Sequence, residues 1–140
     1  MAAVFGTIGR GIDCEDLASR WHRSLMMPFD RLRAGQAGYA LALAVYDVTE
    51  SFPKREWYGL GAQARRAAFS IPLNLAEGSA RRGASEFRRF ADIAIGSLSE
   101  LRIALRIARD RELLSQAQLD GLQELLDSFW KASVPPGSSP

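Results

Sequence analysis

Residues 84–111 carry the longest amphipathic pattern in the chain, and this pattern limits the possible folds most strongly. Apolar side chains recur there every three or four residues, which is the spacing of one face of an α-helix. The stripe consists of Phe87, Phe90, Ala91, Ala94, Leu98, Leu101, Leu105 and Ala108. A helix of this kind buries its stripe against other helices, so the segment predicts a helical bundle.

A second apolar stripe lies on roughly the opposite side of the same predicted helix. It consists of Ile93, Gly96, Ile103 and Ile107. A helix with two apolar faces needs two partners, and the bundle itself supplies only one of them. We therefore predict that these four residues form an oligomer interface with a second copy of the chain.

Three further segments show helical periodicity, over about residues 33–51, 57–78 and 116–131. The first is expected to end at Phe52, because the following proline disfavours helix for the residue before it. Short loops separate all four predicted helices, which favours antiparallel neighbours. The sequence thus predicts an all-α fold, an antiparallel up-down-up-down four-helix bundle.

Four residues mark an expected kink and the expected ends of these helices. Pro72 lies inside the segment 57–78 and should kink it, since proline removes one backbone donor. Gly78 is expected to end that helix, because glycine accepts the left-handed conformation that follows a helix. Ser115 and Gln118 have the spacing of a capping box at the start of the last helix.

The chain divides into an N-terminal extension (1–32), the bundle (33–131) and a C-terminal tail (132–140). The tail is rich in Pro, Gly and Ser and is expected to be disordered. In the extension, Asp13 could cap a short helix over residues 14–26. Its apolar side would consist of Leu17, Trp21 and Leu25. Met26 and Met27 are alternative start residues for the bundle-forming part.

Cysteine content and hydropathy favour a cytoplasmic protein. Cys14 is the only cysteine, so no internal disulfide can form, which suits a reducing compartment. No apolar run is long enough to cross a membrane. Residues 1–10 lack the continuous apolar stretch of a signal peptide.

The residue types of common active sites are scarce, which predicts a protein that is not an enzyme and holds no cofactor. The only histidine, His22, has no nominated partner for nucleophilic catalysis. No Cys or His spacing suits a metal ion, and the glycines form neither a P-loop nor a dinucleotide-binding fingerprint.

One polar constellation stands out on two of the predicted helices. It consists of Ser70, Asn74, Glu77, Ser97 and Glu100. The first interpretation is a hydrogen-bond network that satisfies the carbonyl freed by Pro72 and fixes the register of the two helices. The second is a catalytic carboxylate pair, Glu77 with Glu100. We favour the network, because no nucleophile or metal ligand accompanies the carboxylates.

Positive charge concentrates in the middle of the chain, although the net charge is only +2. Such a cluster can neutralise phosphates without reading bases, which gives salt-sensitive binding. The candidate nucleic-acid-binding residues are Arg65, Arg66, Arg81, Arg82, Arg88 and Arg89. A solvated, salt-bridged helix surface is the alternative. These arginines do not predict a stacking platform for single strands.

Several motifs of this chain occur in the same order in a known bacterial family. They are Val45–Thr49, Phe52–Lys54, Tyr58–Leu60, Gln63–Ala67, Ser70–Gly78 and Phe87–Leu101. Over about residues 29–131 the chain resembles the four helix bundle protein family. Its founding members are encoded by intervening sequences within large-subunit ribosomal RNA genes.

The resemblance implies a left-handed four-helix bundle that assembles into a ring-like homopentamer. A related branch, the accessory variability proteins of diversity-generating retroelements, binds nucleic acid and a reverse transcriptase through a basic surface. The six arginines named above are the matching basic positions, and the family offers no catalytic residue. This chain departs from the family at Gly35, where a tryptophan is usual, and Gly38 further weakens the first helical turns.

The sequence therefore supports two functional hypotheses. The first is a non-catalytic homo-oligomer that binds RNA or DNA through its arginines. The second is a protein-interaction scaffold, such as an accessory subunit of a reverse transcriptase, that does not bind nucleic acid directly.

Overall fold

The computed structural model describes residues 28–134 and residue 137, and it is all-helical over this part of the chain. A single turn of 3-10 helix, η2 (Pro28–Arg31), precedes the α-helices. They are α2 (Arg33–Glu50), α3 (Lys54–Trp57), α4 (Leu60–Ala80), α5 (Ala84–Asp110) and α6 (Gln116–Ser133). The prediction of an all-α fold with four long helices is confirmed. The helix predicted over residues 14–26, the alternative starts and most of the predicted tail lie outside the described residues.

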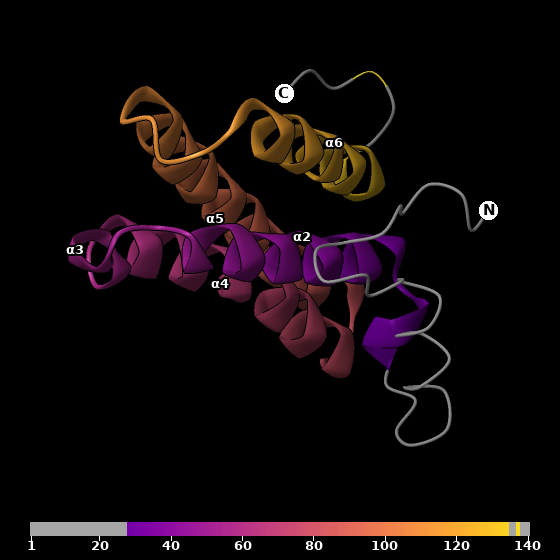
Figure 1. Ribbon diagram of the computed structural model, residues 1–140. Helices are drawn as coiled ribbons and strands as arrows, with labels where there is room; N and C mark the ends of the chain where they lie inside the picture. Colours follow the sequence, from indigo (N-terminus) through magenta and orange to yellow (C-terminus); the bar gives the residue numbers. More distant parts are fainter. Residues whose placement is uncertain (1–27, 135–136, 138–140) are drawn as a thin grey trace.

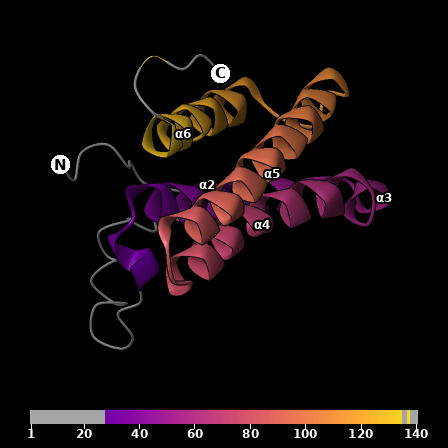
Figure 2. The same cartoon turned by 180° about the vertical axis from the view of Figure 1, so that it is seen from behind.

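Helix α2 lies at the centre of the packing, against both α4 and α6, while α4 packs most extensively against α5 (Figure 1). Seen from behind, α5 crosses obliquely in front of α2 and α4 (Figure 2). Contacts of Gly78 with Phe87 and Phe90, together with the pairing of Ser70 with Ser97, make α4 and α5 antiparallel. The full up-down-up-down order and its left-handed sense stay predictions.

Small residues in α2 allow its neighbours to approach closely. A Cβ at Gly38 would lie 2.9 Å from Ile71 Cγ2 of α4 and 3.3 Å from Phe129 Cε2 of α6. Ile71 and Phe129 are fully buried, so Gly38 sits at the junction of three helices. The low helix propensity of this glycine is offset by packing that a larger residue would prevent. The other fully buried large side chains are Leu41, Val45, Thr49, Leu75, Leu98 and Leu101.

Close packing also explains the glycine at position 35. A Cβ there would lie 2.8 Å from Cε2 and 2.9 Å from the carbonyl oxygen of Phe29. The ring of Phe29 thus covers the first turn of α2 at Gly35. The helix begins at Arg33 in spite of this glycine.

The expected end of the second long helix at Gly78 is wrong. α4 continues to Ala80, and Gly78 is buried where α4 touches α5. Its missing side chain serves close helix approach, not a left-handed end. The helix also continues through Pro72, which is buried inside it. The glycine with positive φ in this region is Gly83, at φ 97°, which directly precedes α5.

The start of that helix also differs from the prediction. Trp57 belongs to α3, a separate single turn, and α4 begins only at Leu60 after Tyr58 and Gly59. The indole Nε1 of Trp57 donates to the carbonyl of Phe52 at 2.7 Å, which holds the turn against the end of α2.

The capping box of the last helix is confirmed. The Gln118 amide donates to Ser115 Oγ at 3.2 Å, and the Ser115 amide donates to Gln118 Oε1 at 2.9 Å. Each side chain satisfies a backbone donor that the helix start would otherwise leave free. Of the helices in the described ranges, none combines the length and apolarity that crossing a membrane requires.

Candidate functional site

A chain of hydrogen bonds joins α4 to α5 at the polar constellation. Asn74 Nδ2 donates to Ser70 Oγ at 3.0 Å, and Ser70 Oγ lies 2.8 Å from Ser97 Oγ. Ser97 Oγ in turn donates to the Ile93 carbonyl at 3.2 Å. With Ser70 donating to Ser97, every hydroxyl both donates and accepts. Ser97 is only 7 % exposed, so this pairing satisfies groups that water cannot reach.

The two carboxylates of the constellation lie outside this network. Glu77 accepts from Arg81 Nε at 3.0 Å on the surface, and Glu100 is exposed on α5. Glu77 lies seven residues beyond Ser70, and Glu100 three residues beyond Ser97 on the antiparallel helix. At 1.5 Å per residue the two are about 15 Å apart along the helix axes. This spacing is too long for a catalytic pair that shares a proton or a substrate atom.

Asn74 also differs from its expected role toward Pro72. Its Nδ2 donates to the Ser70 carbonyl at 2.8 Å, whereas the carbonyl four residues before Pro72 belongs to Ala68. The network therefore links helices without capping the carbonyl that the proline frees. Among residues 28–134 and 137, no three His, Cys, Asp or Glu side chains gather closely enough to hold a metal ion.

The six candidate arginines fall into two groups. Arg65 and Arg66 lie in the first half of α4, and the other four surround the turn between α4 and α5. Residues 66 and 81 are about 22 Å apart along α4, at 1.5 Å per residue. One phosphate cluster cannot contact both groups, so the turn arginines form a site of their own. We call this set (Arg81, Arg82, Arg88 and Arg89) the turn arginines.

Two of the turn arginines form ion pairs with glutamates, and the other two form none with a described residue. Arg81 pairs with Glu77, and Arg89 Nη2 lies 3.7 Å from Glu86 Oε2. The same two guanidinium groups lie 5.8 and 5.0 Å from the ring centre of Phe90. In the described part of the chain, nothing forms an ion pair with Arg82 or Arg88. Phe90 is half-buried and lies beside both guanidinium groups, so its ring is not freely exposed to a base.

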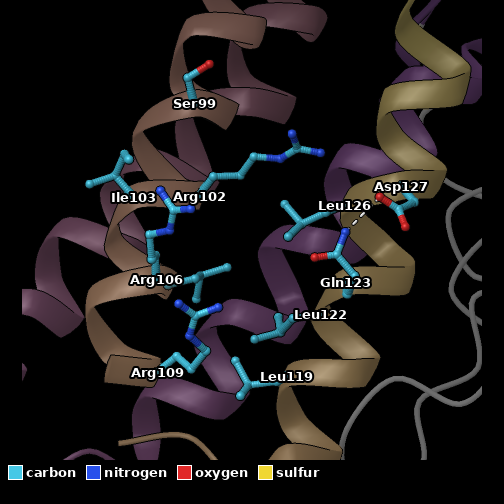
Figure 3. A pocket seen from close by; sticks show the side chains of 11 residues that line it. Ser99, Arg102, Ile103, Arg106, Arg109, Leu119, Leu122, Gln123, Leu126 and Asp127 are labelled. Carbon is cyan, nitrogen blue, oxygen red and sulfur yellow. Dashed lines mark hydrogen bonds between the residues drawn. The ribbon is translucent and has the colours of Figure 1, made fainter. Parts of the chain in front are cut away.

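A groove of about 600 Å³ separates the second half of α5 from α6 (Figure 3). Its α6 wall is largely apolar and includes Leu119, Leu122 and Leu126. Along the α5 side lie Arg102, Arg106 and Arg109, whose side chains border the opening in Figure 3. Sequence periodicity could not find this groove, because it depends on how far α5 and α6 diverge.

Arg102, which lines this groove, also contacts the ring of Trp130 on α6. Its guanidinium carbon lies 5.8 Å from the ring centre of Trp130. The indole Nε1 of Trp130 is buried and has no hydrogen-bond partner within the described residues. On the other wall, Gln123 Nε2 donates to Asp127 at 2.8 Å, and Asp127 is the one acidic residue among those lining the groove.

The candidate oligomer interface faces solvent in the single chain. Ile93, Ile103 and Ile107 are all exposed on one side of α5, and a Cβ at Gly96 would meet nothing within 4 Å. On α4, Phe69 and Leu73 are also exposed, one turn apart. Phe69 and Leu73 were not among the predicted site residues, although their four-residue spacing is visible in the sequence. Exposed apolar side chains that cluster on a surface make it a candidate for protein contacts.

Comparison with known proteins identifies the larger group to which this structure is similar. A family model described as "23S rRNA-intervening sequence protein" matches residues 30–132. The match begins in η2 and ends in α6, so it covers all four long helices. No curated protein matches the sequence significantly.

Proposed function

The chain belongs to the 23S rRNA-intervening sequence protein family, and from this premise we propose that it is a non-catalytic, cytoplasmic homo-oligomer that binds nucleic acid. The turn arginines would neutralise phosphates of RNA or DNA. The observation that carries the proposal is their grouping around one short turn at the end of the α4–α5 pair, with Arg82 and Arg88 free of ion pairs among the described residues.

The two paired arginines are also suited to this role. Their ion pairs with Glu77 and Glu86 are exposed, and exposed pairs contribute little free energy. A phosphate can therefore replace either carboxylate at small cost. Because arginine presents a planar fork of donors, it can bind two phosphate oxygens at once.

The oligomeric part of the proposal rests on the exposed isoleucines of α5. A stripe of Ile93, Ile103 and Ile107 in water is unfavourable, and a second copy could cover it. A homopentamer is the assembly that the family resemblance implies. A ring would also repeat the turn arginines around one axis and so multiply weak phosphate contacts.

The binding test compares two variants that each lose three positive charges. R82A/R88A/R89A removes most of the turn arginines and leaves the Arg81–Glu77 pair in place. R102A/R106A/R109A removes the arginines along the groove and is the matched control. Fluorescence anisotropy with a labelled RNA hairpin and a labelled DNA duplex should show weak binding for the first variant only. Affinity of the wild type should fall steeply with salt, with a log–log slope of about 0.9 per phosphate contact.

Equal affinity of the wild type and the turn variant would refute the proposed site. Equal losses in both variants would indicate a nonspecific response to net charge. Circular dichroism at matched concentration checks that both variants keep their helices.

The groove between α5 and α6 favours a second candidate function, a protein-interaction scaffold such as a reverse-transcriptase accessory subunit. A leucine wall beside arginines suits a partner helix that carries apolar and acidic residues. Affinity purification from the native host should then recover a protein partner that resists nuclease treatment. The substitution L119D, at a half-buried position of the groove, should abolish its recovery, while Y46D, on α2 outside the groove, should not.

A further inference from the structure

The end of the molecule formed by α3 carries two aromatic side chains that are exposed among the described residues. Tyr58 is 92 % exposed, and its neighbour Trp57 is 40 % exposed. Figures 1 and 2 both place α3 at the far end of α2 and α4 from η2. A phenol ring this exposed contributes nothing to the core, and both of its faces are open to a ligand.

The backbone that carries these rings is fixed on both sides. Trp57 Nε1 donates to the Phe52 carbonyl at 2.7 Å, and Phe52 is itself buried. Arg65 Nη2 donates to the Trp57 carbonyl at 2.8 Å. Tyr58 therefore projects from an anchored turn, and little conformational entropy is lost when a planar ligand stacks on it.

Positive charge surrounds the rings, and the nearest acidic group is neutralised. Lys54 and Arg55 are in α3 itself, and neither forms an ion pair with a described residue. Glu56, between them and the rings, pairs with Arg111 Nη2 at 3.2 Å and is mostly buried. Two available cations thus lie within four residues of the exposed tyrosine, as phosphate contacts beside a stacked base require.

We propose that the α3 end is a binding site for single-stranded nucleic acid, with an unpaired base stacked on Tyr58 and the flanking phosphates on Lys54 and Arg55. Bases in a duplex already stack on each other, so only an unpaired base can use the tyrosine. This inference rests on the proposed binding of nucleic acid and adds a second site to it. The distance from Leu60 to the turn arginines is about 30 Å along α4, at 1.5 Å per residue.

The proposed site differs from the sequence-based prediction, which expected no platform for single strands. The sequence places Arg65 seven residues after Tyr58, inside what looks like one helix. The separate turn of α3 brings the carbonyl of Trp57 to the Arg65 guanidinium. One of the six candidate arginines therefore supports the aromatic turn, at the opposite end of α4 from the turn arginines.

The test uses labelled 12-nucleotide single strands of RNA and of DNA and a 12-base-pair duplex, in fluorescence anisotropy titrations. Y58A should weaken binding of the single strands about fivefold or more and leave duplex binding unchanged, since stacking on one base is worth that much. Y58F keeps the ring and should bind as the wild type does. Y46A removes another exposed aromatic ring, on α2 outside the site, and is the control. The RNA and DNA arms show whether the sugar matters.

A second variant tests the phosphate contacts. K54A/R55A should lower affinity for single strands and flatten the log–log salt dependence by about 0.7 per lost phosphate contact. Both residues are on the surface, so the fold should be unaffected, and thermal unfolding followed by circular dichroism verifies this.

The outcomes separate this inference from the proposed function. If Y58A binds single strands as tightly as the wild type while R82A/R88A/R89A does not, the stacking site is refuted and the turn site stands. If Y58F loses as much affinity as Y58A, the hydroxyl acts and stacking is refuted. If Y58A loses single-strand binding while the turn variant keeps duplex binding, the α3 site stands and the turn site fails. A wild type that binds no nucleic acid overturns both.

Discussion

Gly78 lies so close to Phe90 that a Cβ built on the glycine would be 2.8 Å from the Cβ of Phe90. The absence of a side chain at Gly78 thus permits the close approach of α4 to α5. G78A should therefore destabilise the protein by about 1–3 kcal/mol, because the helices must separate to admit one methyl group. Urea unfolding followed by circular dichroism measures the change.

A glycine in open space provides the control for this substitution. Gly121 lies inside α6, and a Cβ there would meet nothing within 4 Å. G121A should stabilise the protein by about 0.5–1 kcal/mol, since alanine is the better helix former. If both variants shift the unfolding midpoint in the same direction, the close contact at Gly78 is not the cause.

The hydrogen bond between the hydroxyls of Ser70 and Ser97 should appear as a coupling free energy between the two positions. S97A removes a partner that Ser70 holds at 2.8 Å and should cost about 1 kcal/mol. In a double-mutant cycle with S70A, the two losses should not add, because the first substitution already breaks the bond. S99A is the control, since Ser99 makes the same kind of bond to a carbonyl, Ile95 at 3.2 Å, but is exposed. Additive losses at 70 and 97 would contradict a shared bond.

The capping box at the start of α6 predicts an order of stability among variants at Ser115. S115A should cost about 1 kcal/mol, because it exposes an amide donor at the helix start. S115D should remain near the wild type, since aspartate is also a good cap and its charge suits the helix N-terminus. Thermal unfolding of the three proteins at neutral pH gives the order. An S115D protein as unstable as S115A would rule out capping as the role of Ser115.

If the exposed isoleucines of α5 form an oligomer interface, a charge placed among them should separate the subunits. I103D should convert the oligomer to single chains at micromolar concentration, because a buried carboxylate would have no partner at the interface. Light scattering coupled to size-exclusion chromatography measures the mass. Y46D, at an exposed position on α2, should leave the assembly intact. A wild type that is already a single chain at this concentration argues against the whole interface.

Local patterns in the sequence were sufficient for the helices and for the cap. The spans of α2, α5 and α6 follow from spacing within each segment, and the box of Ser115 and Gln118 involves residues only three apart. Such features can be predicted from the sequence because they depend only on residues of the same helical turn or the same amphipathic face.

Long-range contacts explain what the sequence could not predict. Gly78 resembles a helix end until Phe90, twelve residues later, is placed against it. A partner outside its own helix therefore decides the role of Gly78.

The separation of the two arginine groups follows from helix geometry. Arg66 and Arg81 belong to one predicted helix, and fifteen residues of helix keep them far apart. The aromatic turn does not follow from the sequence, because helical periodicity places Trp57 at the start of the long helix. Only the break at Tyr58 and Gly59 places the rings outside it.

The position of α6 has a consequence for synthesis of the protein. α4 and α5 are joined by three residues and can pair as soon as both have left the ribosome, whereas Phe129 of α6 reaches Gly38 only about 90 positions later in the chain. Translation adds about 5–20 residues per second, so the α6-facing surface of α2 stays in water for seconds on every nascent chain. Ribosomes that stall before α6 would release chains with that surface uncovered, and we expect such products to aggregate or to require a chaperone.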